Sequence, residues 1–91
     1  MVSKEDLQFI ISILDSNDKK ELVKQFSYVF REMMEEKIIS KPWYYKMMKG
    51  YAPSDDLLMR ACEINDKLRE FIIKKAVEKA NRVLETVRNT G

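Results

Sequence analysis

Residues with the chemistry for catalysis or metal binding are few in this chain of 91 residues. It contains no histidine, which removes the commonest general base and the commonest metal ligand. Cys62 is the only cysteine, so an intrachain disulfide is impossible, and no cluster of cations accompanies it to lower its pKa. It falls on the far side of its predicted helix from Leu57 and Leu68, a position compatible with an exposed thiol, and we interpret it as inert.

Carboxylate pairs do not form a predicted site either. Glu35 and Glu36 are adjacent in sequence, as are Asp55 and Asp56, so helical geometry points the two members about 100° apart. Glu32 lies one turn from Glu36, but no further ligand accompanies them, which favours a solvated face over a metal site. The sequence therefore predicts no catalytic residues, no cofactor and no metal, and the protein is expected not to be an enzyme.

The segment best suited to binding runs from Lys37 to Pro53. It contains four lysines, four aromatic residues and no acid. Tryptophan and tyrosine are enriched at the centres of protein interfaces, and flexible methionines adapt to the shape of a partner. We therefore expect a small adaptor, inhibitor or regulatory subunit that binds another protein through Trp43, Tyr44, Lys46, Met48, Lys49 and Tyr51.

Nucleic acid is the alternative partner for the same segment. Lysines interleaved with aromatic rings attract phosphates and stack on bases, so Lys41, Lys46 and Lys49 could serve a dimeric nucleic-acid-binding regulator. Two observations weigh against it. The net charge is only +2, and in a helix-turn-helix arrangement Asp55 and Asp56 would face phosphates from the start of the reading helix.

A third interpretation gives the segment a structural role. Trp43, Tyr44 and Met47 would cover the core while the lysines stay in water. Six methionines is a high number for this length, and such side chains also fill gaps in cores. We expect Met33 and Met47 in the core, and Met34 and Met48 at the surface.

Composition places the chain among helix-rich globular domains. Hydrophobic residues make up 45% and charged residues 35%, with two glycines and two prolines. The length predicts a single domain over residues 1–91. The N-terminus lacks the features of a signal peptide, and no apolar run reaches the length of a membrane span, so we expect a cytoplasmic protein that does not contact a membrane.

Helix signals divide the chain into four segments. Ser3 precedes acids at the start of the first, Asp18 and Glu21 have the spacing of a capping box, and Gly50 suits a left-handed residue after a helix. The predicted fold is all-α, a compact bundle of three to four helices at about residues 4–14, 19–39, 42–49 and 54–88.

The last segment presents apolar residues as two stripes displaced by roughly 120° around the helix axis. Either the helix bends or breaks between Asn65 and Glu70, or it stays straight and overhangs the rest of the fold. An overhanging apolar face predicts a homodimer, whereas a bend lets the second helix of the same chain cover it. The self-association candidates are Ile72, Ile73, Ala76, Val77, Ala80, Val83, Leu84 and Val87.

Overall fold

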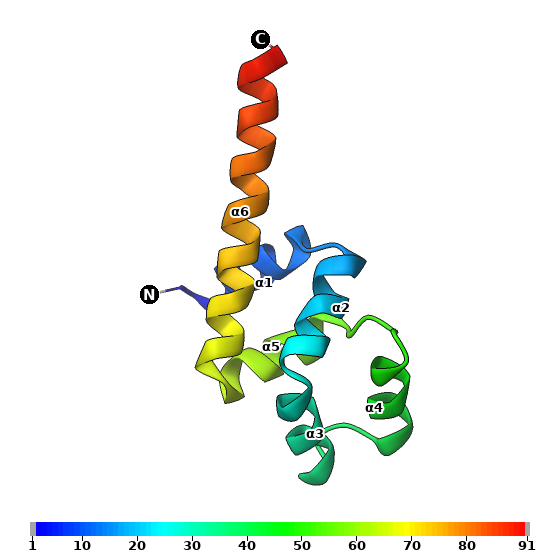
Figure 1. Cartoon of the computed structure of the whole chain (residues 1–91). Coiled ribbons are helices and arrows are strands. Elements are labelled where there is room, and N and C mark those ends of the chain that lie inside the picture. The colour runs from blue at the N-terminus through cyan, green and yellow to red at the C-terminus, as the bar shows by residue number, and fades with distance from the viewer. Residues whose placement is uncertain (1, 91) are drawn as a thin grey trace.

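Six helices joined by short turns make up the described part of the chain, residues 2–90 of a computed structural model (Figure 1). They are α1 (Lys4–Ile13), α2 (Ser16–Gln25), α3 (Ser27–Glu35), α4 (Lys41–Met48), α5 (Asp55–Ile64) and α6 (Asp66–Thr90). Helix accounts for 81% of the chain and no strand occurs within residues 2–90. The all-α prediction is confirmed, but a bundle of three to four helices is not, because two predicted helices are each interrupted.

The start of α2 differs from the sequence prediction. Asp15, not Asp18, is the N-cap: its Oδ1 accepts from the backbone N–H of Asp18 at 2.9 Å. Asp18 Oδ2 accepts in return from the N–H of Asp15 at 3.1 Å, which completes a capping box. Two overlapping stretches had the spacing of a capping box, and the upstream one forms, so α2 begins at Ser16.

The predicted helix over 19–39 is interrupted at Phe26, whose backbone departs from helical geometry (φ −118°, ψ 30°). No glycine or proline marks this break. The ring of Phe26 instead packs edge-on against Phe71 of α6, with ring centroids 5.5 Å apart. The second piece, α3, ends at Glu35, and Lys37 follows with a left-handed backbone (φ 64°).

The predicted helix over 54–88 is likewise divided, at Asn65. Its backbone is extended (φ −134°, ψ 115°), which ends α5. Its side-chain Oδ1 accepts from the N–H of Leu68 at 2.9 Å, so the same residue caps the start of α6. The break therefore occurs, at the first residue of the predicted range, and the helix that follows it, α6, still overhangs the rest of the fold (Figure 1).

Two groups of helices share the hydrophobic core. α1, α5 and the first half of α6 contact one another, α2 contacts both α3 and α4, and α2 also contacts α6. The largest fully buried side chains are Phe30, Ile11, Leu22, Met33, Met47, Leu58, Leu68, Ile72 and Val29. Cys62 is buried as well, although its position on the helix was also compatible with an exposed thiol. Burial raises its pKa to about 11, which opposes thiolate chemistry.

α6 extends well beyond the hydrophobic core to which its first half contributes. Its buried residues are Leu68, Ile72 and Ala76, and every side chain described from Ala80 onward is exposed. The helix has 25 residues, a length of about 37 Å, and the molecule extends 50 Å along its longest axis. Figure 1 shows the C-terminal half of α6 standing clear of the other helices.

Candidate protein-binding surfaces

α4 and the turn after it are built by local signals in the sequence. Ser40 Oγ accepts from the N–H of Trp43 at 3.3 Å, and Pro42 occupies the first turn. At the other end Gly50 has φ 111°. The N–H of Gly50 donates to the carbonyl of Met47 at 3.0 Å and that of Tyr51 to Lys46 at 3.2 Å, the hydrogen bonds of a Schellman motif.

The structure divides the aromatic segment between core and surface. Trp43 and Tyr44 are half-buried and pack against the core, and Met47 is buried within the core. These three residues therefore cover or complete the core, as the structural interpretation of the segment expects. Met33 is buried with Met47 as predicted, whereas Met34 is only half-exposed.

The outward side of the segment carries the remaining predicted residues. Met48 is 39% exposed and Tyr51 60% exposed, and the side chains of Lys46 and Lys49 lie in solvent. Tyr45, which we did not predict as a binding residue, is 54% exposed and packs edge-on against the ring of Tyr44. Four of the six predicted partner-binding residues thus lie at the surface.

An open groove separates this surface from α2. A hollow of about 500 Å³ adjoins a second of about 370 Å³, and both are lined by Lys20, Lys49 and Gly50. We call the two together the α2–α4 groove. No acid lines it. The other lining residues are Ser16, Val23, Lys24, Ser27, Met47, Met48, Tyr51 and Ala52.

Sequence reasoning missed the α2 wall of this groove. From the sequence alone Lys20, Lys24 and Ser27 are expected to form a solvated face of their helix, because nothing in the sequence places α4 opposite them. In the structure none of the three groove lysines, Lys20, Lys24 and Lys49, makes an ion pair with another described residue. The available signal was the segregation of charge around α2, where lysines and acids occupy different sides.

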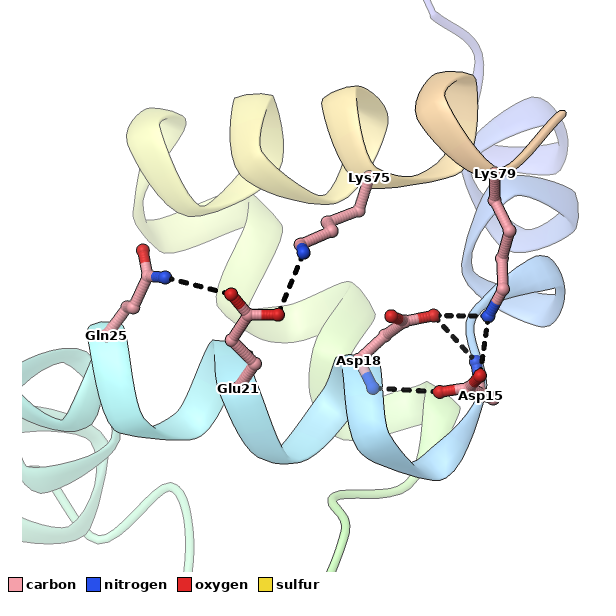
Figure 2. A network of polar contacts seen from close by, with 6 residues as sticks. All are labelled: Asp15, Asp18, Glu21, Gln25, Lys75 and Lys79. Carbon is pink, nitrogen blue, oxygen red and sulfur yellow. Dashed lines mark hydrogen bonds and ion pairs between the residues drawn. The ribbon is translucent and has the colours of Figure 1, made fainter. Parts of the chain in front are cut away.

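The acids of α2 are turned toward α6, as Figure 2 shows. Lys79 Nζ lies 2.7 Å from Asp15 Oδ2 and also binds Asp18 Oδ2. The hydrogen bond from Lys79, helped by the backbone N–H of Asp18, lowers the pKa of Asp15 from 3.8 to about 2. The hydrogen bonds that Lys79 donates to the carboxylates of Asp15 and Asp18 raise the pKa of Lys79 above its ordinary value of 10.5.

One turn further along, Lys75 repeats this contact. Its Nζ lies 2.8 Å from Oε2 of Glu21 (Figure 2). The other carboxylate oxygen of Glu21, Oε1, accepts a hydrogen bond from Gln25 Nε2 at 3.3 Å. The carboxylate of Glu21 raises the pKa of Lys75. α2 therefore holds its acids against α6 and leaves its unpaired lysines to the groove.

The lysines proposed for nucleic acid do not gather at one hollow. Lys41 lines a different hollow, of about 470 Å³, with Glu35 and Lys37 among its other lining residues, whereas Lys49 lines the α2–α4 groove. Asp55 at the start of α5 is engaged by Lys19, whose Nζ lies 2.7 Å from its Oδ1. This ion pair turns the carboxylate of Asp55 toward α2.

The predicted self-association residues separate into core and surface. Ile72 and Ala76 are buried in the chain's own core and Ile73 is half-buried, so these three are committed largely to the monomer. The rest are exposed and span about 120° of the helix circumference. We call them the α6 stripe: Val77, Ala80, Val83, Leu84 and Val87.

Comparison with protein-family models, with curated proteins and with solved structures finds no match to this chain. Within residues 2–90 no helix combines the length and the apolar character needed to cross a membrane. The same part of the chain brings no three His, Cys, Asp or Glu side chains together in a metal-binding arrangement. The exposed apolar side chains and the α2–α4 groove are thus the features from which function can be argued.

Proposed function

We propose that this chain is a small non-enzymatic binding protein that pairs with a second copy through the α6 stripe and recognises another protein through the surface of α4 and its following turn. The observation that carries the proposal is the overhang of α6. From Ala80 onward every described side chain of this helix is exposed, yet the helix continues to present apolar side chains along one side.

A second copy of α6 fits this stripe by shape. Soluble monomers rarely leave a continuous apolar face in water, and two amphipathic helices bury such faces by packing side by side. Ala80 lies in the middle of the stripe, where its small side chain allows the backbone of another helix to approach, and Leu84 and Val83 supply the area around it.

The expected affinity follows from the exposed fractions. Val77, Val83, Leu84 and Val87 are 53%, 59%, 55% and 61% exposed. Complete burial of such a side chain contributes about 1.5–3 kcal/mol, so covering the exposed half of all four in both copies contributes about 6–12 kcal/mol. Association itself costs at least about 4 kcal/mol, so the net is at most about 2–8 kcal/mol. The upper part of this range, about 4–8 kcal/mol, corresponds to a Kd between about 1 mM and 1 µM, and we propose an affinity in that range.

Ala80→Glu tests the pairing. Because Ala80 is exposed, the substitution should leave the helical circular dichroism spectrum unchanged while placing two charges in the centre of the paired stripe. Sedimentation equilibrium should then show a monomer. The matched control is Arg82→Glu, which lies about 200° from Ala80 around the helix and should still pair. A wild-type chain that remains monomeric at about 1 mM refutes the pairing.

Nucleic acid is the second candidate partner, favoured by the exposure of Lys41, Lys46 and Lys49. Binding of this kind weakens steeply as salt rises, because bound counterions are released from the phosphates. A titration with duplex and single-stranded DNA at two salt concentrations, repeated with Lys46→Glu, tests it. Absence of salt-dependent binding in the wild type removes this candidate.

A further inference from the structure

We infer that the α2–α4 groove is the recognition site itself and that it takes an acidic segment of a partner protein, one that also carries apolar side chains. This inference deepens the partner-binding part of the proposed function and rests on it. It is independent of the pairing through α6, because the groove and the α6 stripe share no residue.

The charge of the groove determines the kind of partner. Lys20 and Lys24 lie one helical turn apart on the α2 wall, and Lys49 faces them from the end of α4. All three side chains are exposed, none is engaged in an ion pair within residues 2–90, and no carboxylate lines the groove. A partner that places carboxylates between the two walls neutralises the lysines from both sides.

The floor of the groove adds a second requirement. Val23 and Met47 are buried at 4% and 2% exposure, and Met48 stands at the rim with 39% of its surface exposed. Methionine adapts its shape to apolar ligands, and Tyr51 offers an exposed ring and hydroxyl at the far end. The groove thus suits an amphipathic segment better than a free anion.

Two other occupants fit less well. The α6 stripe of a second copy contains no carboxylate and has Arg88 at its edge, so it offers the groove lysines no opposite charge. A nucleic acid is held mainly through its phosphates by an extended series of cations, whereas here three lysines surround a floor of Val23 and Met47. An acidic amphipathic segment matches both the rim and the floor.

The orientation of α2 keeps the lysines available. Asp15, Asp18 and Glu21 are the acids nearest to Lys20 in sequence, and each is bound to Lys75 or Lys79 of α6. Those ion pairs hold the acidic side of α2 against α6 (Figure 2), and none of the three acids lines the groove. The groove therefore keeps its positive charge although the whole chain has a net charge of only +2.

The test uses the full-length protein and a fluorescein-labelled synthetic peptide that is helical and amphipathic, with glutamates one turn apart beside leucines. A second peptide replaces each glutamate by glutamine, and a labelled single-stranded DNA serves as the third probe. Fluorescence anisotropy should show that the glutamate peptide binds at least about tenfold more tightly than the glutamine peptide. Its addition should shift the methyl NMR signals of Met47 and Met48.

Charge reversal then identifies the groove. Lys20→Glu combined with Lys24→Glu should weaken the glutamate peptide by at least about tenfold, whereas the matched pair Lys4→Glu and Lys67→Glu, outside the groove, should change it less than about twofold. Equal binding of both peptides, or an equal loss in the two double variants, overturns the acidic chemistry while leaving partner binding intact. Tighter binding of the DNA than of either peptide overturns the choice of a protein partner.

Discussion

Two turns in this chain have the same hydrogen bonds but different residues, and this difference predicts opposite effects of substitution. After α3, Lys37 donates to the carbonyl of Met34 at 3.0 Å and Ile38 to that of Met33 at 2.8 Å. After α4, Gly50 occupies the position equivalent to Lys37. Both have positive φ, 64° for Lys37 and 111° for Gly50. We predict that Lys37→Gly stabilises the fold and that Gly50→Ala destabilises it.

The magnitudes follow from backbone conformation. A residue with a β-carbon in the left-handed region costs about 1–2 kcal/mol, and glycine loses about 0.5–1 kcal/mol more conformational entropy on folding. Lys37→Gly should therefore raise the free energy of unfolding by about 0.5–1 kcal/mol. A β-carbon at Gly50 meets nothing within 4 Å, so its cost is purely conformational. By the same arithmetic, Gly50→Ala should lower the free energy of unfolding by about 0.5–1 kcal/mol.

Urea and thermal unfolding followed by circular dichroism measure both changes. For a domain of this size about 1 kcal/mol shifts the Tm by roughly 4–8 °C, so the two variants should lie on either side of the wild type. The slope of the urea transition should not change. Lys37→Ala is the control, since it keeps the β-carbon and should leave stability nearly constant. If Lys37→Gly proves no more stable than Lys37→Ala, conformational strain is not what distinguishes the two turns.

Three further predictions concern α6 and its contacts. Asn65→Ala should lower stability by about 1 kcal/mol, because the N–H of Leu68 loses its cap, whereas Asn65→Asp, which keeps an acceptor, should not. Leu84→Ala should weaken self-association by about thirtyfold with an unchanged monomer, since about 1 kcal/mol is lost in each copy; an unaltered sedimentation profile contradicts this. The stabilisation from Asp15 should be complete above about pH 4 and should disappear as the pH falls toward 2, because its pKa is depressed from 3.8 to about 2. Unfolding measured across this range should depend less on pH in Asp15→Asn, and an identical pH dependence excludes the contact with Lys79 as its source.

The local signals in the sequence were sufficient for the helical class and for several helix ends. Ser3, Ser40 and Ser54 each cap the helix that follows, with the hydroxyl accepting a backbone N–H three residues later. Gly50 adopts the positive φ that its place after α4 requires. Such features depend on a few neighbouring residues, so one sequence is enough to recognise them.

The interruptions and the groove depend on contacts between distant residues. Phe26 ends α2 where its ring meets Phe71, 45 positions later in the sequence. Lys20 and Lys24 become a binding wall only because α4 folds back opposite α2. The sequence could show that α2 carries lysines and acids on different sides, but it could not show which side faced α6.

Both proposed surfaces depend on α6, but on different parts of it. In its first half, Lys79 binds Asp15 and Asp18 and so fixes the acidic side of α2. From Ala80 onward the side chains of α6 are exposed and continue the α6 stripe. Pairing along Val83 to Val87 therefore need not disturb the ion pairs that orient the groove lysines. A dimer formed in this way carries two grooves with unchanged geometry. A partner with two acidic segments then binds the second groove intramolecularly, so a weak individual site gains strength from the linkage between protomers.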